Sequence, residues 1–188
     1  SIKPTLLDAS INTSNLLTIQ QNIKKYSPTP KQVQIIAVTK TLSFNAIKSA
    51  IANNIFLIGE SKIQETQQKT QKQHIGKEAQ FHLIGHLQSN KVKKAIKLYH
   101  TIQSVDSISL AETINKCAQK SNKKQNIFLQ IKTKETSTPF GFLEKEIYKT
   151  TVKLKKLKNI KIVGIMAIGP NTTNKTITNK AFKSTLKT

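Results

Sequence analysis

Short apolar runs recur along the chain, and most of them are rich in β-branched residues. They read VQIIAV (33–38), IFLIG (55–59), FHLIG (81–85), IFLQI (127–131) and IKIVGIMAIG (160–169), with a weaker run, HTIQSV, at 100–105. Each run is nearly continuous rather than alternating, which is typical of strands in a sheet that is buried on both faces. The pattern therefore predicts six buried strands.

The segments between these runs carry apolar residues at helical spacing. In 107–120 and again in 143–157 the apolar positions recur at intervals of three and four residues, which predicts one buried face of a helix in each segment. A further helix is predicted at the start of the chain, over about 5–25. One helix followed by six alternating β-α units predicts an α/β fold with parallel strands and right-handed crossovers.

Two architectures satisfy this order of elements, an open doubly wound sheet and a closed barrel. No glycine-rich fingerprint follows the first strand, whose continuation reads IIAVTKTLS, and this counts against a dinucleotide-binding sheet. Because no repeat or low-complexity linker divides the chain, residues 1–188 are predicted to form one domain.

In both architectures the chemistry gathers where strands end and lead into the following helix. The residues expected at these ends are Thr39-Lys40, Gly59-Glu60-Ser61, Gly85-His86, Asp106, Lys132-Thr133 and 167–170. Lys40 directly follows a buried run, and apolar walls there would favour the uncharged amine, which is a nucleophile for an aldehyde. The alternative is that Lys40 extends into solvent from the strand end.

Two other strand ends carry polar clusters with ordinary structural explanations. Glu60 and Glu65 can complement the dipole of a helix that begins after the second strand. His82 and His86 have the i, i+4 spacing of metal ligands, but they bracket a strand-to-loop transition and lack carboxylate or cysteine partners at suitable spacing, so no metal site is predicted. Ser89 is expected to cap the next helix.

Five motifs, in this order and spacing, resemble the pyridoxal phosphate homeostasis protein family, which is similar to the N-terminal barrel domain of alanine racemase. They are IIAVTKT, GESKIQE, FHLIGHLQSNK, TIQSVDS and VGIMAIGP, and the resemblance runs from about residue 5 to residue 188. It implies a (β/α)8 TIM-barrel-like fold that binds pyridoxal 5′-phosphate.

The resemblance also implies the residues that bind this cofactor. Lys40 would hold it as a Schiff base with the cofactor aldehyde, and Ser61 replaces the asparagine of the family's usual Gly-Glu-Asn motif near the cofactor ring. His82, Gln88, Ser89 and Asn90 are expected to line the mouth of the site, and Met166 is expected to flank the ring.

The chain departs from the family pattern in two further places. After the fifth strand it has Lys132 and 139–141 (Pro-Phe-Gly) where the family shows an asparagine and a Lys-x-Gly. The family continues with Ser-Met-Gly-Met-Ser and Arg-Ile-Gly segments, whose two strands supply most of the phosphate cup. Because a complete barrel takes about 250 residues, this chain is expected to be truncated after about six β-α units, with the two C-terminal strands missing.

Composition changes this picture little. The 31 basic residues against 9 acidic ones give a net charge of +22, but all 31 are scattered lysines. Without arginine, the preferred residue for phosphate and base contacts, no specific nucleic-acid partner is predicted. One cysteine, Cys117, no apolar window of membrane-spanning length and no visible secretory signal predict a cytoplasmic protein without a membrane partner.

Four functions stay open at this point. The first is a pyridoxal phosphate-binding protein of intracellular cofactor homeostasis, not an enzyme, a monomer or weak dimer whose partners are the cofactor and pyridoxal phosphate-dependent apo-enzymes. The others are a truncated, weakly binding or inactive relative, an amino-acid racemase and a basic nucleic-acid-binding protein. Racemisation needs a second base, a tyrosine in the related racemases. Tyr99 precedes the fourth strand, whereas Tyr26 and Tyr148 lie in predicted helices.

Overall fold

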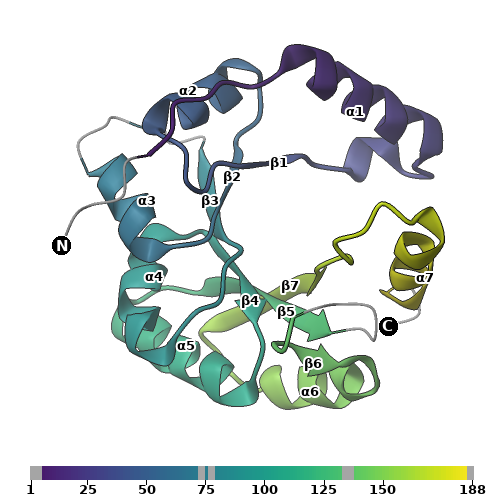
Figure 1. Cartoon of the computed structure of the whole chain (residues 1–188). Coiled ribbons are helices and arrows are strands. Elements are labelled where there is room, and N and C mark those ends of the chain that lie inside the picture. Colours follow the sequence, from purple (N-terminus) through teal and green to yellow (C-terminus); the bar gives the residue numbers. More distant parts are fainter. Residues whose placement is uncertain (1–5, 72–74, 76–78, 133–137, 186–188) are drawn as a thin grey trace. The chain divides into compact units, whose positions relative to one another are not determined.

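The computed structural model describes residues 6–71, 75, 79–132 and 138–185, and of the side chains in 181–185 only that of Lys183. The backbone forms two compact units, Ser1–His82 and Leu83–Thr188, so that the boundary falls inside the third strand (Figure 1). The single domain expected for residues 1–188 stays a prediction.

The first unit alternates strands and helices, as the apolar pattern predicts. Its elements are α1 (Thr13–Tyr26), η1 (Pro30–Gln32), β1 (Ile36–Val38), α2 (Phe44–Ala52), β2 (Leu57–Glu60), α3 (Ile63–Thr70) and β3 (Gln80–Leu83). β1 and β2 are parallel with Val38 opposite Gly59, and β3 follows β2 in the sheet order. The carboxyl ends of β1 and β2 therefore lie at one edge of this unit, where Lys40 and Ser61 follow them.

The first helix begins later than the sequence pattern predicts. α1 starts at Thr13 because the side chain of Asn12 accepts a hydrogen bond from the backbone N–H of Asn15 and caps the helix. Upstream, Leu7 pairs with the loop after β1 instead. Its N–H donates to the Thr41 carbonyl at 3.1 Å, and its carbonyl accepts from the Ser43 N–H at 2.7 Å. The expected helix over about 5–25 was therefore wrong in its first turns.

The second unit is built around one long central strand. Its elements are η2 (Ser89–Lys91), α4 (Val92–Leu98), β4 (Thr101–Val105), α5 (Ile108–Lys120), β5 (Gln125–Lys132), β6 (Phe142–Leu143), η3 (Glu144–Glu146), α6 (Ile147–Leu154), β7 (Ile160–Ala167) and α7 (Lys175–Thr185). β5 pairs in parallel with β4, β6 and β7. Helices α4 and α5 lie side by side (Figure 1).

The two-residue strand β6 has no counterpart in the predicted order of elements. It becomes possible at Gly141, whose φ of +125° is one that side-chain-bearing residues rarely adopt. A Cβ at this position would stand 2.9 Å from both the Ile131 carbonyl carbon and the Lys132 nitrogen. Gly141 thus lets the loop after β5 return close enough for Phe142 to pair with Ile131.

Burial follows the predicted two-sided pattern in β4 and β5 but not in β7. All five residues of β4 are buried, and Ile127, Leu129 and Ile131 of β5 are fully inaccessible. In β7, Val163 is 41% exposed. The reason is position in the sheet: in the described part of the chain β7 pairs with β5 alone, so only part of it is covered.

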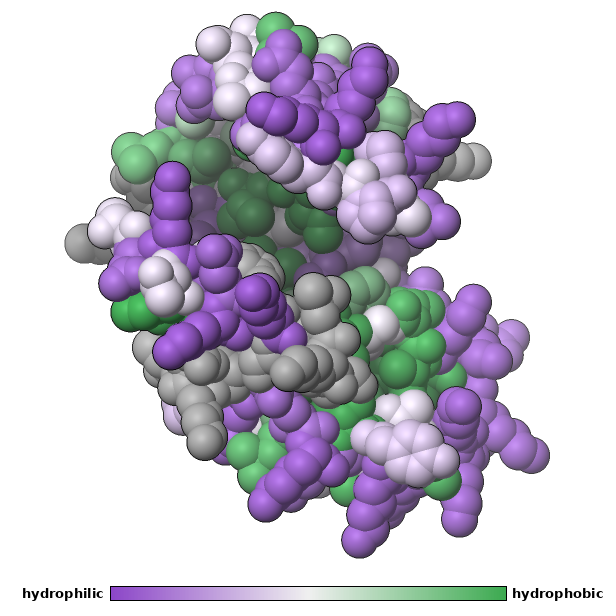
Figure 2. Space-filling view, turned by 90° about the vertical axis from the view of Figure 1, so that its right-hand side faces the viewer, coloured by the Kyte–Doolittle hydropathy of each residue, from purple (hydrophilic) through white to green (hydrophobic). Residues whose placement is uncertain are grey.

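Hydrophilic side chains project over much of the face drawn in Figure 2, in agreement with a sequence that carries 31 lysines. None of the helices in the described ranges combines the length and the apolar character that crossing a lipid bilayer requires.

Replacing Leu129 with alanine should strongly destabilise the chain, because this side chain is fully buried in the central strand. We expect a loss of about 2–5 kcal/mol in the free energy of unfolding, the usual cost of a large-to-small change in a core. Val163→Ala on the exposed side of β7 is the matched control and should cost less than about 1 kcal/mol. Urea unfolding measures both, and equal losses would contradict this placement of the core.

Candidate functional site

Lys40 lies in a tight turn at the carboxyl end of β1. The Thr39 carbonyl accepts the Leu42 N–H at 3.1 Å and closes a four-residue turn with Lys40 second and Thr41 third. Thr39 is buried, whereas Lys40 is exposed and its ammonium group has no hydrogen-bond or ion-pair partner among the described residues. The exposed side chain agrees with the alternative in which Lys40 extends into solvent from the strand end.

Ser61 reaches the same edge of the first unit on the neighbouring strand. Because β1 and β2 are parallel and pair Val38 with Gly59, Lys40 and Ser61 each follow that pair by two residues. The Thr39 N–H continues the ladder by donating to the Gly59 carbonyl at 3.0 Å. The structure thus brings Lys40 and the half-buried Ser61 to adjacent strand ends.

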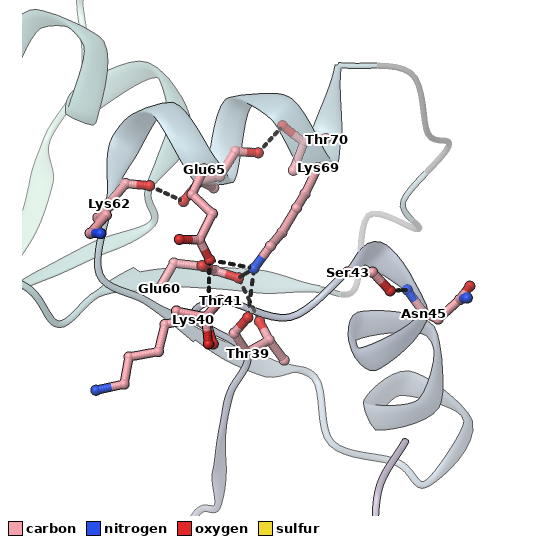
Figure 3. Close-up of polar contacts among 11 residues, drawn as sticks. Thr39, Lys40, Thr41, Ser43, Asn45, Glu60, Lys62, Glu65, Lys69 and Thr70 are labelled. Carbon is pink, nitrogen blue, oxygen red and sulfur yellow. Dashed lines mark hydrogen bonds and ion pairs between the residues drawn. The ribbon is translucent and has the colours of Figure 1, made fainter. Parts of the chain in front are cut away.

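A buried ionic cluster lies beneath this edge. The Lys69 ammonium from α3 donates to Glu60 Oε1 at 2.7 Å and to the Thr39 carbonyl at 2.6 Å, and it lies 3.0 Å from Glu65 Oε1. Thr39 Oγ1 also donates to Glu60 Oε1, at 2.5 Å. In Figure 3 the Lys69 side chain runs toward this cluster, whereas Lys40 points away from it.

From the sequence, Glu60 and Glu65 are expected to complement the dipole of a helix, and no role is predicted for Lys69. Glu65 does lie in the first turn of α3, but the side chains of Glu60 and Lys69 are both wholly buried. The available signal was the i, i+4 spacing of Glu65 and Lys69, which places the two side chains on one face of a helix.

Burial dominates the electrostatics of Glu60. It raises the pKa of this carboxyl above the ordinary 4.5, and the hydrogen bonds from Lys69 and Thr39 offset the rise only in part. Oε2 of Glu60 is buried and has no hydrogen-bond partner among the described residues. Ionising this group therefore leaves one charged oxygen without a donor.

The other predicted cofactor residues are distributed over both units. His82 is buried in β3 of the first unit, while Met166 lies half-buried near the end of β7, opposite Gln130. Ser89 and Asn90 are exposed in η2, and the cap position of η2 is Gln88. The expectation that Ser89 caps this helix was wrong, because Ser89 is already its first residue. The roles of His82, Ser89, Asn90 and Met166 stay predictions.

The second unit contains a pair of side chains at its strand ends that the sequence pattern does not predict. Nδ1 of His86, after β3, lies 3.2 Å from Oδ2 of Asp106, after β4. The His86 ring stacks on Phe140 of the loop after β5, with ring centroids 3.9 Å apart. The sequence placed His86 and Asp106 at neighbouring strand ends but gave no signal that they pair. Among the described residues, no group of three or more His, Cys, Asp and Glu side chains could hold a metal ion.

The three tyrosines lie where the strand and helix pattern predicts. Tyr99 is buried directly before β4, at the opposite end of that strand from Asp106. Tyr26 ends α1 and Tyr148 lies in α6, and both are largely exposed. None of the three follows the carboxyl end of a strand.

The raised pKa of Glu60 has a consequence for stability. A carboxyl whose pKa is higher in the folded chain favours folding at low pH, and this contribution is lost as the pH rises from 4.5 through the folded-state pKa. Glu60→Gln removes the ionisation and keeps the shape. The melting temperature of the variant, relative to the parent chain, should therefore increase as the pH rises above 4.5. The exposed Glu112→Gln should follow the parent, and a Glu60→Gln profile parallel to the parent would contradict the assignment.

Comparisons with known proteins agree with this architecture. The family model described as alanine racemase, N-terminal domain, matches residues 14–187. An alanine racemase of Clostridium difficile has the same fold with a TM-score of 0.73 at 19% identity, covering 98% of this chain and 48% of the racemase. The predicted α/β, TIM-barrel-like fold is confirmed by these likenesses, while the truncation stays a prediction.

More similar relatives carry another name. A pyridoxal phosphate homeostasis protein of Synechocystis is 35% identical over 141 residues, which are 75% of this chain and 65% of that protein. The chain therefore spans slightly less than two thirds of this relative. The structure of PipY from Synechococcus elongatus with pyridoxal phosphate bound matches with a TM-score of 0.76 at 28% identity, covering 93% of this chain and 80% of PipY.

The family match covers nearly the whole chain, and the motifs around Lys40 and Ser61 lie inside it. The chain belongs to the alanine racemase N-terminal domain family, and the resemblance to the pyridoxal phosphate homeostasis proteins within it is confirmed.

Proposed function

We propose that this chain binds pyridoxal 5′-phosphate in intracellular cofactor homeostasis and holds it as a Schiff base on Lys40, without catalysing a reaction of its own. The observation that carries the proposal is the contrast between Lys40, at the end of β1, and Lys69 of α3, whose ammonium contacts the same strand end. Lys40 is exposed and makes no polar contact through its amine within the described residues, whereas Lys69 is buried among three oxygen acceptors.

This contrast fits the chemistry of an aldehyde cofactor. A neutral amine adds to the aldehyde carbon, the carbon–nitrogen bond forms, and the carbonyl oxygen leaves as water. Lys69 would have to give up three polar contacts and enter solvent before it could react. Lys40 needs no such rearrangement, so of these two lysines it is the accessible amine.

The relatives support the binding of pyridoxal phosphate. PipY has been solved with pyridoxal phosphate bound, and its likeness covers 93% of this chain. By the family motifs, Ser61, His82, Ser89, Asn90 and Met166 are the further residues that we assign to the cofactor. Ser61 has the best structural support among these, because it follows the strand that pairs with the strand of Lys40.

The proposal also covers the location, the oligomeric state and the partners of the protein. We place the protein in the cytoplasm, as a monomer or weak dimer that passes the cofactor to pyridoxal phosphate-dependent apo-enzymes. The free thiol of Cys117 fits a reducing compartment. No observation in the structure favours a specific nucleic-acid partner over the general effect of a charge of +22.

Adding pyridoxal phosphate to the purified chain and reducing with borohydride should attach the cofactor to Lys40 in preference to other lysines. Peptide mass spectrometry measures the modification at each position. Lys40→Ala should remove the dominant adduct, because it removes the accessible amine at the strand end. Lys62→Ala is the matched control, since this exposed lysine lies in the same unit at the end of β2, and the adduct should persist. Equal labelling of Lys40 and Lys62 in the parent chain would refute the proposed function.

The absence of a catalysed reaction has its own test. Incubating the chain with pyridoxal phosphate and alanine in heavy water should give no more deuterium at the alanine α-carbon than free cofactor gives, because no tyrosine base is assigned at the strand ends. Nuclear magnetic resonance of the alanine α-proton measures this exchange. Exchange that depends on the chain and disappears in Lys40→Ala would establish a racemase-like activity instead.

A further inference from the structure

We propose that Glu65 and Lys69, supported by Glu60, are positioning residues that clamp the backbone on both sides of Lys40. The inference rests on the proposed function for its meaning, because it concerns how the cofactor-binding lysine is presented. Its geometric basis is independent of any cofactor and lies wholly within the first unit (Figure 3).

The first observation is a strained residue directly after Lys40. Thr41 has a φ of +65°, in the left-handed region. At the third position of a four-residue turn this conformation normally belongs to glycine or asparagine, and a β-branched residue there is an outlier. Such conformations persist only where the surrounding structure enforces them.

The second observation identifies what enforces it. Lys69 Nζ donates to the carbonyl of Thr39, the residue before Lys40, at 2.6 Å. The carboxylate of Glu65 accepts the N–H of Thr41, the residue after Lys40. Lys69 and Glu65 also contact each other at 3.0 Å, so one ion pair holds the peptide groups on either side of Lys40.

Glu60 holds both Lys69 and Thr39 in place by hydrogen bonds. Glu60, the last residue of β2, accepts from Lys69 at 2.7 Å and from the Thr39 hydroxyl at 2.5 Å. Because this ion pair is buried, water competes little for its hydrogen bonds. On the outer side, the Leu7 N–H donates to the Thr41 carbonyl at 3.1 Å, so the turn is bonded from both sides.

These contacts fix the backbone of Lys40 and leave its side chain without a polar contact among the described residues. The Cα of Lys40 is held by its neighbours, while its side chain carries no polar contact to another described residue. Orientation of a reacting group contributes strongly to rate and affinity, and small displacements weaken both. Lys69 has a second effect, because its bonded ammonium cannot compete with Lys40 for an aldehyde at the same edge.

The obvious alternative is that the cluster only stabilises the fold. A structural ion pair would change global stability when it is removed, but it would have no selective effect on the turn or on the reactivity of Lys40. The test therefore compares local readouts among folded variants.

Two substitutions at position 65 separate the roles. Glu65→Gln keeps an oxygen that can accept the Thr41 N–H, whereas Glu65→Met has similar length and no such acceptor. In the chain without cofactor, deuterium exchange of the Thr41 amide should be about tenfold faster in Glu65→Met and change less than about threefold in Glu65→Gln. The amides of β4 serve as the reference and should exchange alike in both folded variants.

The second readout is the ratio of Lys40 to Lys62 modification by pyridoxal phosphate and borohydride. In Glu65→Met this ratio should fall about tenfold, because the turn no longer holds Lys40 in place. In Glu65→Gln it should stay close to that of the parent chain. An unchanged Thr41 exchange, or an unchanged ratio in a parent chain that labels Lys40 selectively, would overturn the proposal.

If Glu65→Met does not fold, the same substitution is made in a Thr41→Gly background, where glycine relieves the left-handed strain. The amide at position 41 should then exchange about tenfold faster than in Thr41→Gly alone, and equal exchange would overturn the clamp. The exchange experiment needs no cofactor. A parent chain that fails to label Lys40 selectively would therefore refute the proposed function while leaving the clamp to be decided by exchange.

Discussion

The buried ammonium of Lys69 is the interaction on which the arrangement at the end of β1 depends. It joins α3 to the last residue of β2 and to the turn after β1, through Glu60, Glu65 and the Thr39 carbonyl. A buried ion pair is weak evidence for stability, because desolvation consumes much of the attraction and apolar replacements are often as stable. The Lys69–Glu65 pair fixes the direction of two backbone groups, the Thr39 carbonyl and the Thr41 N–H. An apolar contact would not do so. The one unpaired oxygen of Glu60 and the raised pKa of its carboxyl indicate that the cluster is not optimised for stability alone.

Much of the fold could be predicted because burial on both faces leaves a continuous apolar signature. The weak run at 100–105 became β4, in which every residue is buried, and the stronger run at 160–169 became the less covered β7. The order of the strands in the sheet explains why the weaker run is the more buried of the two. A local sequence pattern does not carry information about this order. β6 could not be predicted because a strand of two residues is too short to show a hydrophobic periodicity. Its formation depends on the glycine at position 141. The first helix was placed too early since Leu7 pairs with a loop 35 residues away in sequence.

The candidate site was predictable where local position determines it. Lys40 follows a strand, and that alone places it at the carboxyl end of β1. Its exposure was one of the two alternatives that the sequence left open. The clamp around it was not predictable, because Lys69 contacts partners 9 and 30 residues away in sequence. The pairing of His86 with Asp106 was missed for the same reason. Each residue looked ordinary in its own segment, and only the parallel arrangement of strand ends gives it a partner.

A chain with 31 lysines raises the question of how one amine would be selected for the proposed Schiff base. The number of lysines cannot select one of them. A lowered pKa alone is not enough either, because burial lowers the pKa of Lys123 and also restricts access to its amine. Lys123 Nζ donates to the carbonyls of Ile96 and Tyr99, at 2.7 and 2.9 Å, so an aldehyde could reach this nitrogen only after two hydrogen bonds break. Lys69 is withheld by three contacts in the same way. Lys69 and Lys123 are thus both lysines whose hydrogen bonds keep the amine from reacting. Under the proposed function, selection among the exposed lysines would then depend on where the backbone holds each one. In that case the rigid turn under Lys40 would matter more than the environment of its amine.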